Sequence, residues 1–240
     1  MSDNICYRDA YARSVSARVL QTDADGVILD RTVFYPGGGG QPADAGWLAL
    51  ASGARLGVVS ARKRGDDIVH VLEEGVETPD VGSEVTVEID WERRHDLMRT
   101  HSALHVLCGV VWRDHGAQVT GGNMEPLAGR MDFEFETMHA ELVGEIERRV
   151  NEEVEADHEI RVDVLPRDQA FAIPDLIRTK INLLPEGISE VRTIEIVGLD
   201  LQADGGTHVA STGEIGRVRV TGYESKGRIN KRIRIAIEDR

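Results

Sequence analysis

The chain has 240 residues, of which 41% are hydrophobic and 29% charged, the composition of an ordinary globular protein with enough material for a buried core. Its formal net charge is −14 at pH 7, and its two cysteines are too few for a disulfide framework. No apolar run reaches the length of a transmembrane helix, and the N-terminal MSDNICYRDA lacks the apolar core of a signal peptide, so we expect a cytoplasmic protein.

Residues 1–90 contain short segments that alternate apolar and polar side chains and are separated by glycine and aspartate. The segments are SVSARVLQTD, GVILDRTVF, GWLALAS, RLGVVSARKRG, DIVHVLEEG and EVTVEID. Several short strands at such spacing are typical of a small barrel or sandwich. We predict a small β-barrel domain over residues 1–90.

A long helix is predicted to follow this region. Asp90 and Glu92 suit a helix N-terminus, where the helix dipole favours negative charge, and Gly116 is a stop signal after His115. The predicted domain boundary therefore lies between residues 90 and 91.

The rest of the chain mixes helices and strands. Residues 118–136 read as two strands around a loop, and Thr137–Ala156 is the clearest amphipathic helix, with Thr137 as its expected N-cap. Its predicted apolar stripe consists of Leu142, Ile146, Val150 and Val154. The later predicted elements are a strand at Ile160–Leu165, a short helix at Arg167–Ala172, and strands near Val191–Val197, His208–Ala210, Gly216–Tyr223 and Arg228–Glu238. A mostly antiparallel sheet backed by helices makes residues 91–240 an α+β domain.

Two histidines lie four residues apart in the predicted long helix, in the run MRTHSALHVLCGVVW. Positions i and i+4 share one helix face, with Cβ atoms about 5–6 Å apart, so His101 and His105 suit a common metal ion. Such a pair can also simply line a core. His208 favours the metal interpretation, because it follows the adjacent Gly205 and Gly206, which allow a tight turn.

Three motifs together resemble a known family. They are TVFYPGGGGQPADAG at 32–46, HSALH at 101–105 and GGTHVASTGEIG at 205–216. In this order they are similar to the editing domain of alanyl-tRNA synthetases, and most of all to its free-standing relative AlaX in the medium-length form.

The resemblance implies an aminoacyl-tRNA hydrolase with one zinc ion per chain. Its partner would be tRNA(Ala) mischarged with serine, with glycine as the second candidate. Because 240 residues leave no room for an aminoacylation core beside these motifs, we expect the tRNA to be charged elsewhere and edited in trans.

The family's metal ligands are the two helix histidines, a cysteine and a histidine four residues after that cysteine. The resemblance places the last two at Asp204 and His208, so this chain has a carboxylate where the family has a thiolate. Aspartate can ligate zinc, although it weakens the preference for zinc over harder divalent ions. In the alternative arrangement Asp204 contacts the metal ligands without binding the metal, and a water molecule is the fourth ligand. Cys108 is about 10 Å along the helix from His101 and is expected to be a buried apolar residue.

The glycine run before Gln41 is expected to belong to the substrate site. It lacks the lysine of a nucleotide-binding P-loop, but its unobstructed N–H groups could meet a ligand. By resemblance, the loop packs over the editing pocket and Thr32 contacts the serine hydroxyl. The full set of predicted substrate residues is Thr32, Gly38, Gly39, Gly40, Gln41 and Thr207. The alternatives are a hairpin tip for the loop, a plain strand residue for Thr32 and turn hydrogen bonds for Gln41 and Thr207.

A basic cluster near the C-terminus is the predicted tRNA contact, since phosphate binding needs a local patch even in an acidic protein. It consists of Lys226, Arg228, Lys231, Arg232 and Arg234. The alternative is the solvated face of an edge strand, where such charges are common.

Two other functions fit the same residues. One is a catalytically silent module that binds the tRNA acceptor stem, and the other is a metallohydrolase of a small ester or amide. The remaining histidines, which match no motif, are expected to be surface or structural residues: His70, His95, His115, His139 and His158.

Overall fold

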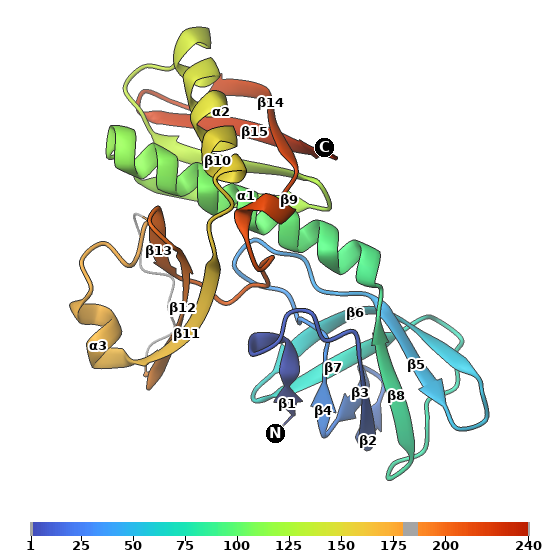
Figure 1. Ribbon diagram of the computed structural model, residues 1–240. Coiled ribbons are helices and arrows are strands. Elements are labelled where there is room, and N and C mark those ends of the chain that lie inside the picture. The colour runs from blue at the N-terminus through green and yellow to red at the C-terminus, as the bar shows by residue number, and fades with distance from the viewer. Residues whose placement is uncertain (1, 180–186, 240) are drawn as a thin grey trace. The chain divides into compact units, whose positions relative to one another are not determined.

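A computed structural model describes residues 2–179 and 187–239 of the chain. They form two compact units, Met1–His95 and Asp96–Arg240, which are described separately (Figure 1). Helix α1 (Trp91–His115) begins in the first unit and continues into the second. The domain assignment of 1–90 and 91–240 stays a prediction. Within the described residues, no helix has the length and apolar character needed to cross a membrane.

The first unit is built around a closed barrel with strand order β2-β3-β7-β6-β5-β8. These strands are β2 (Ser14–Asp23), β3 (Gly26–Leu29), β5 (Gly46–Leu50), β6 (Arg55–Arg64), β7 (Asp67–Leu72) and β8 (Glu84–Ile89). Outside the barrel, β1 (Asp3–Asn4) pairs in parallel with β4 (Arg31–Thr32), and the short helix η1 (Ile5–Tyr7) follows β1.

The barrel closes because alternate side chains of its strands are apolar and point inward. In β8 every second residue is buried, beginning with Val85. Val27, Leu29, Leu48 and Val87 are fully buried in this core. The predicted N-terminal barrel and the α+β class are confirmed.

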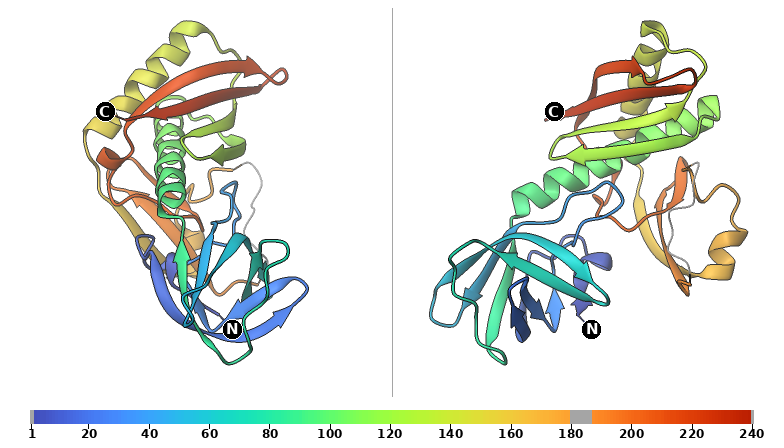
Figure 2. Two further views of the ribbon diagram at one scale, coloured as in Figure 1. Left: turned by 90° about the vertical axis from the view of Figure 1, so that its right-hand side faces the viewer. Right: turned by 180° about the vertical axis from the view of Figure 1, so that it is seen from behind.

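The second unit contains two antiparallel sheets. One has the order β14-β15-β10-β9 and the other the order β11-β12-β13 (Figure 2). The strands are β9 (Val119–Glu125), β10 (Ala128–Glu134), β11 (Ile160–Pro166), β12 (Glu190–Ile196), β13 (Asp200–Ala203), β14 (Arg217–Ser225) and β15 (Asn230–Glu238). The other elements are α2 (Ala140–Glu155), α3 (Arg167–Ala172) and η2 (Thr212–Glu214).

Helix α1 packs closely on the four-stranded sheet at a glycine. A Cβ at Gly129 of β10 would lie 3.2 Å from the side chain of Leu104 and 3.3 Å from that of Thr100. This close approach fixes the helix that carries His101 and His105 against the sheet.

Helix α2 differs from the prediction at its start. It begins at Ala140, and its N-cap is His139, whose ring accepts the Leu142 N–H, so the expected cap at Thr137 was wrong. Its buried residues are Val143, Ile146, Val150 and Val154. Val143 replaces Leu142 in the stripe because a 3.6-residue period alternates steps of three and four.

Two predicted strands near the C-terminus need correction. His208–Ala210 is not a strand, because its backbone donors go to side chains: Val209 N–H to Ser102 Oγ and Ala210 N–H to Glu214. Strand β13, which was not predicted, ends just before Asp204 and pairs with β12. It has only four residues, too few for a clear alternation.

The basic C-terminal strand is not an edge strand. β15 lies between β14 and β10, so both of its edges are hydrogen-bonded. Ile233, Ile235 and Ile237 are buried on one face, and Arg232 and Arg234 lie on the other.

Candidate metal centre

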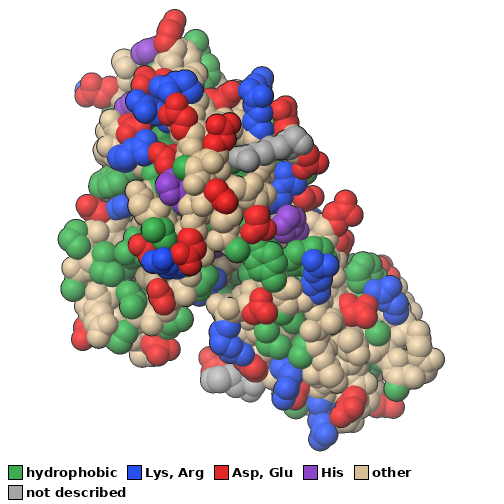
Figure 3. Space-filling view, in the orientation of Figure 1, with side chains coloured by type: hydrophobic (Ala, Val, Ile, Leu, Met, Phe, Trp, Pro, Cys, Tyr) green, Lys and Arg blue, Asp and Glu red, His purple; other side chains and the backbone are tan. Residues whose placement is uncertain are grey.

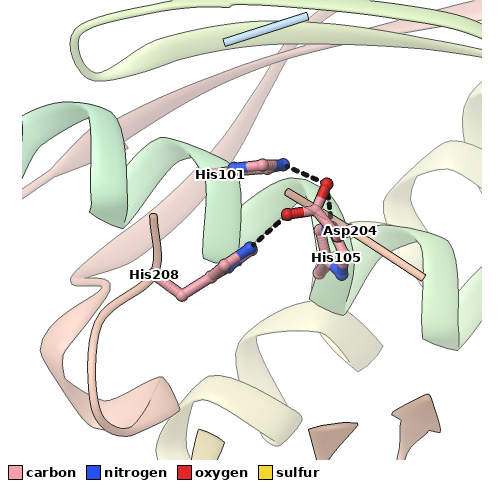
Figure 4. Close-up of side chains that lie close together, drawn as sticks. All are labelled: His101, His105, Asp204 and His208. Carbon is pink, nitrogen blue, oxygen red and sulfur yellow. Dashed lines mark hydrogen bonds and ion pairs between the residues drawn. The ribbon is translucent and has the colours of Figure 1, made fainter. Parts of the chain in front are cut away.

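Four side chains converge in the second unit: His101, His105, Asp204 and His208 (Figure 4). Their potential ligand atoms all lie within 4.8 Å of one another. His208 Nε2 is 3.2 Å from Asp204 Oδ2, and the Nε2 atoms of His101 and His105 are 3.5 and 3.9 Å from Asp204 Oδ1. The structure therefore brings together all four of the residues expected to bind the metal.

Helix α1 contributes two ligand residues to this centre, and the loop after β13 contributes the other two. The rings of His101 and His105, one turn apart on α1, have centroids 5.0 Å from each other. The ring of His208 lies 4.2 and 4.7 Å from them. Asp204 and His208 come from the loop after β13, where the Asp204 carboxylate accepts the Gly206 N–H at 2.6 Å. This short turn aims both side chains at the helix.

Two residues that were not identified from the sequence, Ser102 and Arg192, hold the loop pair in place. Ser102 Oγ lies 3.1 Å from His208 Nδ1 and accepts the Val209 N–H at 3.2 Å. Arg192 donates to the backbone oxygen of Asp204 at 3.1 Å. Ser102 lies inside the HSALH motif, but a serine in a helix gives no local signal that it will meet a residue 106 positions away.

The electrostatics of the centre leave lone pairs available for a cation. Burial lowers the pKa of His101 to about 4. Burial and the neighbouring His101 lower the pKa of His208 well below its usual value, so both rings are neutral at pH 7. Burial alone would raise the pKa of Asp204, but the neighbouring imidazoles, His101 first, hold it well below its usual value. The centre therefore has a buried carboxylate next to two neutral imidazoles, those of His101 and His208.

This donor set fits a divalent cation. Zinc takes imidazole nitrogens at about 2.0–2.1 Å and carboxylate oxygens at about 2.0–2.2 Å, which puts neighbouring ligand atoms roughly 3.4 Å apart. The three spacings to Asp204, from 3.2 to 3.9 Å, bracket that value. Cys108 is outside the cluster and is 2% exposed, and burial raises the pKa of its thiol, so it is a poor ligand.

The glycine-rich loop belongs to the first unit and has a defined shape. Gly38 and Gln41 exchange backbone hydrogen bonds at 3.0 and 2.9 Å, with Gly39 and Gly40 at the turn. Their φ angles of 59° and 89° match a type I′ turn, which requires two left-handed residues. The Tyr35 hydroxyl also donates to the Gly38 oxygen at 3.0 Å. The glycines are thus needed for a fixed hairpin tip, which is exposed from Gly38 to Gly40.

The other predicted substrate residues are buried. Thr32 is 0% exposed, and its Oγ1 accepts the Phe34 N–H at 3.0 Å and lies 2.8 Å from His70 Nε2. Gln41 is 2% and Thr207 0% exposed. Thr207 is hydrogen-bonded through its backbone to His101, in the second unit. The structure thus places Thr32 and Gln41 in one unit and Thr207 in the other.

Most of the basic cluster is engaged by other groups. Lys231 is buried, and its Nζ donates to the oxygens of Gly227 and Arg228 at 2.8 Å. Arg232 forms a two-pronged pair with Asp132, the residue opposite it on β10. Glu224 pairs with Lys226 at 3.6 Å and with Arg234 at 2.6 Å.

Arg228 is exposed, and no ion pair to it is found among the described residues. Acidic and basic side chains are interspersed over the face displayed in Figure 3. Of the predicted phosphate contacts, Arg228, Lys226 and Arg234 are the most accessible.

Comparisons with known proteins identify the family of this chain. Residues 7–93 match the family of class II (A) tRNA synthetases, and residues 191–234 match the second additional domain of threonyl- and alanyl-tRNA synthetases. The alanyl-tRNA editing protein AlaX-M of Saccharolobus solfataricus is 36% identical over 97% of this chain and 98% of its own length. The AlaX-M of Methanosarcina mazei is 35% identical over 100% of this chain and 98% of its own length. The alanine–tRNA ligase of Pyrobaculum aerophilum is 41% identical over 91% of this chain, which spans 25% of that enzyme. With such relatives along its whole length, the chain belongs to the AlaX-M family of alanyl-tRNA editing proteins.

Proposed function

We propose that this protein is a trans-acting hydrolase that removes serine from mischarged tRNA(Ala). The cluster of His101, His105, Asp204 and His208 is the observation that carries the proposal. The bond to be cleaved is the aminoacyl ester at the tRNA 3′ end. Family membership supports the tRNA substrate, and the donor set supports a metal-dependent reaction.

The four cluster residues would hold one zinc ion. Such an ion can activate a water molecule or orient the ester. The chain's own residues keep the donors in place: α1 fixes two imidazoles, Ser102 orients the His208 ring, and Arg192 anchors the backbone of Asp204. The carboxylate replaces the thiolate that the family uses, so zinc should be held less selectively against harder ions.

Deacylation of tRNA(Ala) carrying serine, glycine or alanine tests this function directly. We expect release of serine to be fastest, glycine to be slower and alanine slowest, all measured with purified protein and limiting enzyme. Equal rates for serine and alanine would contradict the proposed discrimination. Binding of charged tRNA without hydrolysis would instead identify a silent binding module, and hydrolysis of small esters without tRNA a general metallohydrolase.

Thr32→Val should reduce the preference of the protein for Ser-tRNA(Ala) over Ala-tRNA(Ala). It keeps the shape of threonine but removes the hydroxyl that we propose contacts the serine side chain. One hydrogen bond is worth about 0.5–1.5 kcal/mol, so we expect the ratio of kcat/KM values to fall roughly threefold to tenfold. The measurement is the ratio for Ser-tRNA(Ala) against Ala-tRNA(Ala), not activity alone.

Thr212→Val is the matched control. Thr212 is also 0% exposed, and its hydroxyl accepts the His158 N–H at 2.9 Å and donates to the Glu153 oxygen at 2.8 Å. Both valine variants lose buried hydrogen bonds and should lose comparable stability, about 1–3 kcal/mol. If Thr32→Val changes selectivity no more than Thr212→Val does, Thr32 is a barrel residue only.

The double substitution Lys226→Gln and Arg228→Gln should weaken binding of charged tRNA without altering the chemical step. Each lost phosphate contact reduces the slope of log K against log salt by about 0.7–0.9. We therefore expect a higher KM and a flatter salt dependence, with kcat unchanged. Arg148→Gln on α2 is the control, because this exposed arginine is paired with Glu152. An unchanged salt slope in the double variant would place the tRNA elsewhere.

A further inference from the structure

His70 is a fully buried histidine in the interior of the first unit. It lies on β7, where its Nε2 is 2.8 Å from Thr32 Oγ1 and its Nδ1 is 3.1 Å from the backbone oxygen of Val27. Its ring also meets that of Phe34 edge-on, with centroids 5.1 Å apart. No residue of the candidate metal centre is among these contacts. Both nitrogens of the ring therefore have defined partners, and an aromatic ring packs against it.

The neighbours of the ring determine where its proton lies. A backbone oxygen can only accept, so the Nδ1 facing Val27 must carry the hydrogen. Burial lowers the pKa of His70 to about 4, so the ring holds no second proton at pH 7. Nε2 is left with a lone pair and accepts a hydrogen bond.

The same logic fixes the hydroxyl of Thr32. A threonine hydroxyl has one hydrogen to donate and two lone pairs. The hydrogen is donated to His70 Nε2, and one lone pair accepts the Phe34 N–H. What remains is a single lone pair and no hydrogen.

We propose that His70 is a positioning residue that makes the Thr32 hydroxyl a pure hydrogen-bond acceptor toward the substrate. The inference rests on the proposed role of Thr32 in reading the aminoacyl side chain. It narrows the substrate class to side chains that donate a hydrogen bond from a group the size of a hydroxyl. Serine has such a donor, whereas alanine and glycine have none, so glycine should be discriminated against along with alanine.

The pairing of β3 with β7 holds His70 in place within the barrel. Gly26 of β3, opposite β7, has a φ of +135°, and a Cβ there would lie 2.1 Å from the backbone oxygen of His70. Only glycine permits this approach. The backbone that carries His70 is thus held at one distance from β3, whose Val27 fixes Nδ1.

Two substitutions of His70 separate its two hydrogen bonds. In His70→Asn the amide nitrogen can replace Nδ1 and donate to Val27, but nothing replaces Nε2. In His70→Gln the longer side chain can place its oxygen near the Nε2 position and accept from Thr32. We expect the asparagine variant to lower the serine-to-alanine ratio of kcat/KM about threefold to tenfold, and the glutamine variant to retain most of it. In a Thr32→Val background neither substitution should lower the ratio further.

The outcomes distinguish this inference from the proposed function. If wild-type protein does not prefer Ser-tRNA(Ala), the proposed function fails. If wild-type protein shows the preference and both His70 variants keep it, or both lower kcat/KM equally for serine and alanine, the positioning role alone fails.

Nitrogen NMR of the wild-type protein tests the hydrogen positions without any assay of activity or any variant. We expect a neutral ring protonated at Nδ1 and unchanged between about pH 6 and 8, the range in which an ordinary histidine titrates. A ring protonated at Nε2 would overturn the inference, because Thr32 would then keep its own hydrogen for the substrate.

Discussion

Replacing His105 with alanine should abolish stoichiometric metal binding and lower deacylation of Ser-tRNA(Ala) at least about 100-fold. A catalytic ion contributes several kcal/mol of charge stabilisation, and each 1.36 kcal/mol is tenfold in rate. His105 is 7% exposed and contributes one of three imidazoles, so its loss leaves an incomplete donor set. Metal content after dialysis and affinity by chelator competition are the measurements. Chelation of the wild-type protein should have the same effect on the rate, and added zinc should reverse it.

His115→Ala is the control on the same helix, because His115 is exposed and lies outside the cluster. It should keep full metal content and rate. Asp204→Asn keeps the shape of the carboxylate but not its charge, and should weaken metal binding. Asp204→Cys should hold zinc more selectively, since a thiolate is a softer ligand than a carboxylate. Undiminished metal binding in His105→Ala would remove the metal centre from the proposal, and undiminished binding in Asp204→Asn would remove Asp204 from the ligands.

The elements that could be predicted from the sequence are those with a strong local period. The strands of the barrel alternate over up to ten residues, and the predicted SVSARVLQTD is the observed β2. The long helix also ends at the predicted His115, because Gly116 adopts a φ of +63° there. In such segments propensity, periodicity and the turn residues all favour the same structure.

The remaining differences between prediction and structure lie in segments whose conformation depends on tertiary contacts. His208–Ala210 looks like a strand start, but the N–H groups of Val209 and Ala210 donate to side chains of α1 and of the following turn. Lys231 and Arg232 look like free cations, but one donates to backbone oxygens and the other pairs with Asp132 across the sheet.

The four residues of the candidate metal centre could be predicted from the sequence, but the residues that position functional side chains could not. Helical spacing alone brings His101 and His105 together, and the family motif adds Asp204 and His208. Ser102 and His70 could not be identified, because each acts on a residue at least 38 positions away and neither stands in a pattern of its own.

A buried ion pair connects two segments of the first unit. Arg94, near the start of α1, and Asp44, after the glycine-rich loop, are 0% and 1% exposed. Arg94 Nε lies 3.0 Å from Asp44 Oδ1, and its other nitrogens donate to the oxygens of Val33 and Ala10. Asp44 also accepts the Tyr35 N–H at 2.6 Å. The pair therefore joins the first turn of α1 to both ends of the loop that follows Thr32.

Asp44→Asn should destabilise the first unit by about 3–5 kcal/mol, because it leaves the Arg94 guanidinium buried without a counter-charge. Urea unfolding of the full chain measures this loss. Glu88→Gln is the control: its partner is Arg55, the two side chains are 35% and 53% exposed, and such a surface pair is worth about 0–1 kcal/mol. Adding Arg94→Met to Asp44→Asn removes the stranded charge and should recover part of the stability, since well-packed apolar residues can replace a buried pair. A loss from Asp44→Asn no larger than that from Glu88→Gln would show that water reaches the guanidinium, and that the loop and helix are held together by their backbone contacts instead.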